Sequence, residues 1–111
     1  MITTHILDLS RGRPASNLAV KLFHSQAGAY VLLGSGTTDD DGRLRTLLPE
    51  SHKLEVGVYK LEFETAPYFQ TQGVVGFYPE VTVVFNVEAG REHYHVPLLL
   101  SPFGYSTYRG S

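Results

Sequence analysis

The sequence contains no cysteine, few charged residues and no long apolar run. Without cysteine there are no disulfides, no thiolate metal ligands and no cysteine nucleophile, and the redox compartment is left open. Charged residues make up 18% and sum to a net charge of −2, so no basic surface is expected to neutralise nucleic-acid phosphates. Every apolar run is far shorter than a membrane span. We therefore expect neither a nucleic-acid partner nor a membrane partner.

The N-terminus also lacks a basic segment followed by an apolar run, which is the pattern of a signal peptide. A cytoplasmic location is the expectation, with peroxisomal or periplasmic alternatives if a leader has been removed. A chain of 111 residues, 42% of them apolar, is expected to form one globular domain over residues 1–111. A domain of this size buries roughly two-thirds of its unfolded surface.

Short runs of valine, leucine, threonine and aromatic residues recur along the chain, separated by turn residues such as Asp39-Asp40-Asp41-Gly42 and Ser101-Pro102. This spacing is typical of an all-β sandwich or barrel. One short helix is indicated over 66–73. Thr65 can cap its start, Pro67 is tolerated in the first turn, and Gly73 suits the position that ends the helix. We expect eight strands near 3–9, 18–24, 30–36, 42–46, 55–64, 80–88, 91–100 and 103–109.

Side chains alternate between the two faces of a strand, so the sequence indicates which residues share a face. In the penultimate strand, the core face is expected to hold Tyr94, Val96, Leu98 and Leu100. The opposite, outer face collects polar and titratable groups from three strands. Its expected members are Thr3, His5 and Leu7; His93, His95, Pro97 and Leu99; and Ser106, Tyr108 and Gly110.

Three further expectations concern single residues. Pro97 removes a ladder hydrogen bond, which predicts that its strand lies at a sheet edge or beside a bulge. Arg109 shares the face opposite Tyr108. His24 and His52 are interpreted as ordinary exposed histidines without a role.

The outer face mixes apolar and titratable side chains, and such a surface favours a binding site or a subunit interface. Two chemistries can use its histidines. His5, His93 and His95 permit a three-histidine zinc site, although no carboxylate is evident to orient them. The alternative is metal-free hydrolysis, in which a neutral histidine takes a proton from water and an arginine stabilises an oxyanion. Arg43 and Arg45, which follow the Asp-Asp-Asp-Gly turn, are candidates for that arginine.

Several motifs resemble the 5-hydroxyisourate hydrolase family, which is related to transthyretin. The resemblance covers nearly the full chain, and its most specific part is the closing segment from His93 to Ser111. The other matching segments are Thr3-Thr4-His5-Ile6-Leu7-Asp8, Gly12-Arg13-Pro14-Ala15, Asp41-Gly42-Arg43 and Phe77-Tyr78-Pro79-Glu80-Val81-Thr82-Val83.

The resemblance implies a fold and an assembly. The family fold is a transthyretin-like sandwich of two four-stranded antiparallel sheets with one short helix. The family assembly is a homotetramer, a dimer of dimers, in which outer sheet faces line a central channel. The polar outer face predicted above would then face that channel.

The resemblance also implies site residues at matching positions. The catalytic set is His5, Arg43, His95 and Ser111, the last with its carboxylate. The substrate-binding set is Tyr108, Arg109, Gly110, Ser106, Leu99 and Pro97. No metal and no cofactor are implied.

The implied substrate is 5-hydroxyisourate, opened by water to 2-oxo-4-hydroxy-4-carboxy-5-ureidoimidazoline in urate degradation. Transthyretin lacks these residues and carries thyroid hormones in the equivalent channel, so His5, Arg43 and His95 favour an enzyme. The alternatives are a hormone-type binding protein without catalysis, a zinc hydrolase and a β-sandwich interaction module.

Overall fold

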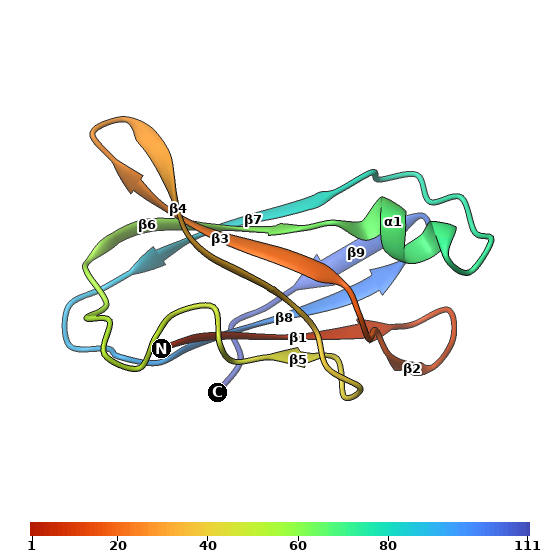
Figure 1. Cartoon of the computed structure of the whole chain (residues 1–111), viewed down its shortest axis with the longest axis horizontal. Helices are drawn as coiled ribbons and strands as arrows, with labels where there is room; N and C mark the ends of the chain where they lie inside the picture. The colour runs from red at the N-terminus through yellow and green to blue at the C-terminus, as the bar shows by residue number, and fades with distance from the viewer.

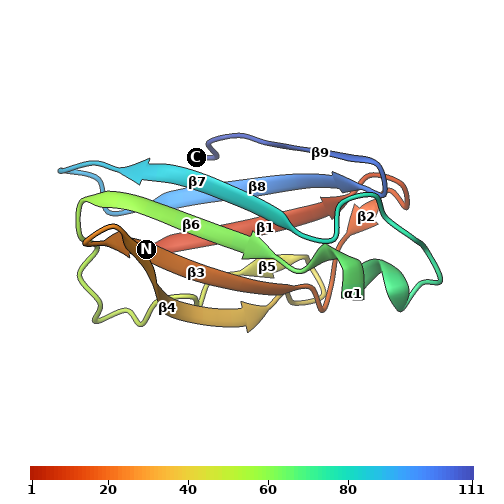
Figure 2. The ribbon, with the colours of Figure 1, turned by 90° about the horizontal axis from the view of Figure 1, so that it is seen from above.

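Two β-sheets lie face to face in a computed structural model that describes residues 1–111, with one short helix at one end (Figures 1 and 2). The predicted all-β sandwich is confirmed. In chain order the elements are β1 Ile2–Asp8, β2 Arg13–Pro14, β3 Ala19–Gln26, β4 Ala29–Thr37, β5 Arg43–Leu44, β6 Gly57–Phe63, α1 Thr65–Gln70, β7 Val81–Val87, β8 Tyr94–Ser101 and β9 Gly104–Thr107.

The first sheet has the order β2-β1-β8-β9, and β5 pairs with β1 on the edge that β2 also uses. The second sheet has the order β4-β3-β6-β7. The expectation of purely antiparallel sheets is wrong at one place, because β1 and β8 pair in parallel. A parallel pair needs a long crossover rather than a tight turn, and here the whole second sheet lies between β1 and β8 in the chain.

The core lies between the sheets and contains 19 buried apolar residues. On the first sheet it is formed by alternate residues of β1 and β8, as the alternation predicts. These residues include Ile2, Ile6, Tyr94, Val96, Leu98 and Leu100, all less than 9% exposed. Thr3, His5, Leu7, His95 and Leu99 therefore face outward from the sandwich.

β8 is an interior strand between β1 and β9, so the expectation that Pro97 marks an edge strand is wrong. The pairs Leu98–Thr107 and His95–Gly110 belong to one register, which places Pro97 opposite Tyr108 without a bulge. Proline has no N–H to donate there, so the β8–β9 ladder stops and resumes at His95. The Thr107 hydroxyl donates to the Pro97 carbonyl at 2.6 Å and satisfies that oxygen.

The predicted helix is present but spans Thr65–Gln70, with Gly73 at φ +69° ending the turn that follows. Thr65 does not cap it as expected. Its hydroxyl donates instead to the Tyr78 carbonyl at 2.9 Å, which ties the start of the helix to the segment before β7. This helix is too short to cross a membrane.

His24 is buried, at 6% exposure, and the interpretation of it as an exposed histidine is wrong. It occupies an inward position of β3, and its ring stacks on Tyr59 with centroids 4.3 Å apart. Stacking and the hydrogen bond between Nδ1 and the Gln26 amide at 3.3 Å offset the burial of its polar ring. His52 is exposed, as expected.

Candidate active site

The register of three strands brings the predicted catalytic residues together on the outer face of the first sheet. His5 of β1 is the pairing partner of Arg43 in β5, and Thr3 of β1 is the partner of His95 in β8. Thr3 and His5 lie two residues apart on the same side of β1. His5, Arg43 and His95 thus come from three neighbouring strands and share one surface, as predicted.

A turn over Asp39–Gly42 positions Arg43. The Asp39 carboxylate accepts hydrogen bonds from the N–H groups of Arg43 and Asp41, each at 2.9 Å, and these bonds lower the pKa of Asp39. Gly42 has φ +74°, and its carbonyl accepts a hydrogen bond from the Ile6 N–H at 2.8 Å. A Cβ at Gly42 would lie 2.5 Å from the Ile6 carbonyl oxygen. Only glycine lets this turn approach β1 closely enough for Arg43 to pair with His5.

His95 is half-buried and is held from two directions. Its Nδ1 lies 2.8 Å from the Thr3 hydroxyl oxygen. Its carbonyl accepts the Gly110 N–H at 2.8 Å, so the C-terminal segment runs across the ring. A Cβ built on Gly110 would lie 2.5 Å from His95 Cδ2, a separation that real atoms do not adopt. The glycine of the Tyr-Arg-Gly-Ser end is therefore required by the space that the His95 ring fills.

A shallow hollow of about 260 Å³ opens over this group, and Arg43, Arg45, His93, His95 and Ser111 line it. Neither arginine forms a salt bridge and no aspartate or glutamate lines the hollow, so positively charged side chains predominate in its lining. Burial lowers the pKa of His95, and the nearby charges of Arg43, His5, His93 and Arg45 lower it further. His95 is therefore neutral near pH 7, and the hollow favours groups that develop negative charge.

The remaining predicted residues divide between two faces. Leu99 pairs with Ser106, and Tyr108 faces Pro97, so these four extend the outer surface beyond the hollow. Arg109 does not join them. Its guanidinium lies 5.2 Å from the centre of the Tyr94 ring, which belongs to the core side of the sheet. The Arg109 side chain thus lies on the face opposite Tyr108, as the alternation predicts, and its role in substrate binding stays a prediction.

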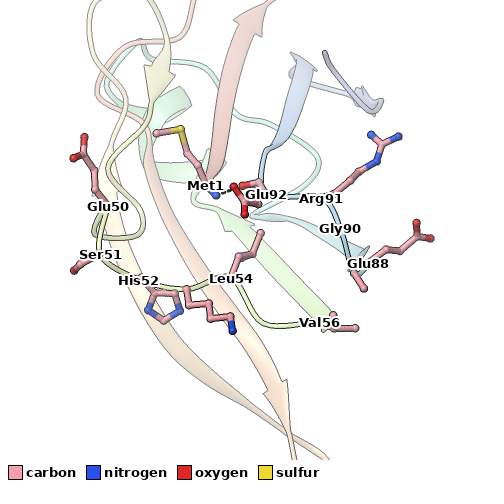
Figure 3. Close-up of a pocket in the computed structure, with 12 residues that line it drawn as sticks. Met1, Glu50, Ser51, His52, Leu54, Val56, Glu88, Gly90, Arg91 and Glu92 are labelled. Atoms are coloured by element: carbon pink, nitrogen blue, oxygen red, sulfur yellow. Dashed lines mark hydrogen bonds between the residues drawn. The ribbon is translucent and has the colours of Figure 1, made fainter.

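A larger hollow of about 650 Å³ lies elsewhere, between the loop over 50–56 and the loop over 88–92 (Figure 3). Its ionisable side chains do not converge, and those of Glu50 and Glu88 point in opposite directions, away from each other. No group of three or more His, Cys, Asp or Glu residues in the chain is arranged to hold a metal ion. The three-histidine zinc site considered for His5, His93 and His95 is not formed.

Sequence reasoning assigned no role to Thr3, yet its hydroxyl is the only protein group that hydrogen-bonds the His95 ring. The alternation of β1 already placed Thr3 beside His5. The alternation pattern does not contain the parallel register between β1 and β8. That register brings Thr3 opposite His95.

Comparisons with known proteins agree on the family. A family model described as HIUase/Transthyretin matches residues 2–110. The 5-hydroxyisourate hydrolase of Halalkalibacterium halodurans is 45% identical over 115 residues, covering 99% of this chain and 97% of the relative.

Two solved structures share the fold. Sea bream transthyretin in complex with thyroxine has a TM-score of 0.91 and 36% identity, covering 98% of this chain and 93% of that one. Klebsiella pneumoniae 5-hydroxyisourate hydrolase has a TM-score of 0.82 and 34% identity, covering 99% and 92%. The fold alone therefore does not separate a carrier from a hydrolase. From the family match over nearly its whole length, the chain belongs to the HIUase/transthyretin family.

Proposed function

We propose that this protein is a 5-hydroxyisourate hydrolase of urate degradation. Water adds to a ring carbonyl carbon of 5-hydroxyisourate, the adjacent C–N bond breaks, and the leaving nitrogen takes up a proton. The product is 2-oxo-4-hydroxy-4-carboxy-5-ureidoimidazoline, which carries the new carboxylate and the freed ureido group. The named relatives with this activity, at 42–45% identity over the whole chain, support the assignment.

One observation carries the proposal beyond family membership. Two histidines and an arginine without a salt-bridge partner share one face, and four ionisable side chains lie near His95, namely Arg43, His5, His93 and Arg45. An amide hydrolysis needs a base for water and donors for the oxyanion, and this set supplies both. General-base catalysis contributes about 10² to 10⁴ in rate, and each oxyanion donor about 10² to 10³.

Each catalytic residue has a role that follows from its place. His5 and His95 flank the place of the attacking water and supply its base between them, and Arg43 stabilises the oxyanion that forms at the carbonyl. Tyr108, 58% exposed beside Pro97, forms a wall for the planar substrate, and Ser111 borders the hollow over His95. Binding of a hormone-type ligand without catalysis is the alternative, and the cationic, histidine-lined hollow argues against it.

The activity can be tested by generating 5-hydroxyisourate with urate oxidase and following its decay by absorbance. Catalytic amounts of the protein should speed the decay beyond the spontaneous rate, and equal amounts of a His95→Asn variant should not. An unchanged decay at micromolar protein would refute the hydrolase proposal.

We propose that no metal or other cofactor takes part. Every role above is filled by side chains of this chain, and the acid–base chemistry needs no electrophile beyond Arg43 and the histidines. Turnover should survive prolonged dialysis against a chelator. Loss of activity that added zinc restores would contradict this and return the three-histidine alternative.

We also propose that the protein works as a homotetramer, a dimer of dimers. Leu7 and Leu99 are only half-buried on the outer face, beside the ring of Tyr108. A surface that mixes such apolar groups with the catalytic ones is better explained by a second copy covering it than by open solvent. A covered hollow also excludes bulk water, which strengthens its electrostatic interactions.

A further inference from the structure

The hydrogen bond between Thr3 and His95 has a direction that the surroundings determine. Thr3 is 5% exposed, and its hydroxyl oxygen lies 2.8 Å from His95 Nδ1. The hydroxyl has no other hydrogen-bond partner in the protein. A hydroxyl carries one proton to donate, and leaving a buried donor without an acceptor is unfavourable.

Only one arrangement of protons satisfies both groups with partners from the protein itself. If Nδ1 carried the ring proton, it would donate to the Thr3 oxygen and the hydroxyl proton would have no acceptor. If Nδ1 is unprotonated, the hydroxyl donates to it and both are satisfied. A neutral imidazole with an unprotonated Nδ1 carries its proton on Nε2. No protein group hydrogen-bonds that nitrogen, so its N–H is free to meet a ligand.

We propose that Thr3 is a positioning residue that locks neutral His95 in the Nε2–H form, so that His95 donates to the substrate while His5 serves as the base. This inference rests on the proposed hydrolase function and deepens it by dividing the roles of the two histidines. Arg43, which lines the same hollow, is the second donor beside it. Together they stabilise the oxyanion that forms when water adds to the carbonyl.

The proton balance of the reaction fits this division. His5 accepts the proton that the attacking water loses as its oxygen bonds to the carbonyl carbon. When the C–N bond breaks, the same proton returns from His5 to the leaving nitrogen. The second proton of the water stays on the new carboxyl group, which releases it to solvent on ionising. His95 keeps its Nε2 proton throughout and acts only as a hydrogen-bond donor, so no net proton change occurs on either histidine.

The charges around His95 favour the neutral ring that this role needs. Arg43 and Arg45 approach from β5 and the residue after it, His5 from β1, and His93 from the segment before β8. Burial opposes a positive charge on the His95 ring most strongly, and these four groups oppose it as well. A protonated ring would also donate from Nδ1 and leave the Thr3 hydroxyl without an acceptor.

The tautomer can be measured in the resting protein. Two-bond ¹H–¹⁵N correlation spectra of the ¹⁵N-labelled protein distinguish protonated from unprotonated ring nitrogens, and loss of signals in His95→Asn assigns the His95 ring. Near pH 7.5 we expect His95 to carry its proton on Nε2. A ring protonated on Nδ1 would overturn the inference whether or not the protein hydrolyses 5-hydroxyisourate.

Kinetics of matched threonine variants provide the second test. Thr3→Val keeps the shape but removes the hydroxyl, and we expect kcat to fall roughly 10-fold, as for the loss of about one hydrogen bond, with KM changed less. Because the lost bond stabilised the neutral ring, the pKa of His95 should rise, and the pH profile of its ring signals in the same spectra should move to higher pH. Thr3→Ser should restore both.

Thr4→Val is the control, because it makes the same change at the next residue of β1, where the hydroxyl faces inward and donates to the Val96 carbonyl. It should lower stability without moving the pH profile. A Thr3→Val protein with the kcat and pH profile of the unmodified protein would refute the role of Thr3. Absence of hydrolysis in the unmodified protein would instead refute the proposed function, and the spectra would still decide the tautomer.

Discussion

At the scale of single residues, His95 and His93 separate the proposed site from a merely titratable surface. They are two positions apart and point the same way, but only His95 is half-buried and held by Thr3 and Gly110. His93 is exposed. We expect His95→Asn to lower kcat by about 10² to 10³, as for the loss of an oxyanion donor, and His93→Asn to lower it by far less. Equal losses in steady-state kinetics would contradict the assignment.

The pKa of His95 predicts how activity depends on pH. Burial has the largest effect, and together with the nearby ionisable groups, Arg43 first among them, it holds this pKa below its ordinary value of 6.5. Protonation of Nδ1 would remove the bond from the Thr3 hydroxyl that positions the ring. The contribution of His95 to kcat should therefore be constant near neutrality and be lost only as the pH falls below that value. Arg43→Gln removes a cation and should move this loss to higher pH, as well as lowering kcat. A shift to lower pH would contradict the proposed electrostatics.

Gly110 gives a residue-scale test of how the C-terminal segment serves His95. Gly110→Ala places a Cβ 2.5 Å from His95 Cδ2, so the ring or the segment must move. Turnover should fall at least 10-fold, because small misplacements of catalytic groups cost that much or more. Gly104→Ala in the same hairpin is the control, since its Cβ would meet nothing closer than Ser101 Oγ at 3.8 Å. Equal activity of the two variants would show that the packing on His95 is unimportant.

At the scale of elements, the end of β1 is joined to the helix through a buried carboxylate. Asp8 is 1% exposed and accepts hydrogen bonds from Ser10, Arg11 and the Tyr68 hydroxyl, the last at 2.7 Å. Desolvation raises the pKa of Asp8, but these hydrogen bonds outweigh it and the net pKa is lowered. The carboxylate therefore stabilises the fold only while it is ionised.

The sign of this linkage gives a stability prediction. A lowered carboxyl pKa contributes stability that is present above the unfolded value of 3.8 and lost as the pH falls through the lower folded value. Tyr68→Phe removes one of the bonds and should cost about 1–3 kcal/mol at pH 7, with a smaller cost in acid where Asp8 is protonated. Urea denaturation of both proteins at pH 7 and at pH 3 measures the unfolding free energy that Tyr68→Phe removes at each pH. An equal loss at pH 7 and pH 3 would contradict the role of the Asp8 charge.

The elements also show what local pattern predicts and what it leaves out. Strand positions and inward faces follow from alternation, and they were predicted correctly for β1 and β8. The structure has β5 and β9 shorter than expected, because each strand ends where its pairing with a neighbour ends. β5 pairs only with Thr4 and His5, and β9 ends before the position opposite Pro97. The Thr65 cap failed because its hydroxyl found a tertiary acceptor.

At the scale of the whole molecule, the outer face should be an interface between copies of the chain. Leu7→Arg adds a charge on that face, next to its partner Leu99 and away from the core. Light scattering should show the proposed tetramer for the unmodified protein and smaller species for the variant, which should also lose most turnover. A fully active monomer in either case would refute the requirement for assembly.

Composition and pattern by themselves determined a cysteine-free β-sandwich and the outward face that carries His5 and His95. The motifs and their resemblance to a known family then selected Arg43 and the C-terminal segment. These features depend on each residue's immediate neighbours, and so they can be read from the chain. The tertiary structure alone decided the parallel pairing of β1 with β8 and the burial of His24. It also decided that Thr3 lies opposite His95, because register between strands some 90 residues apart is set by the packing of the whole sandwich.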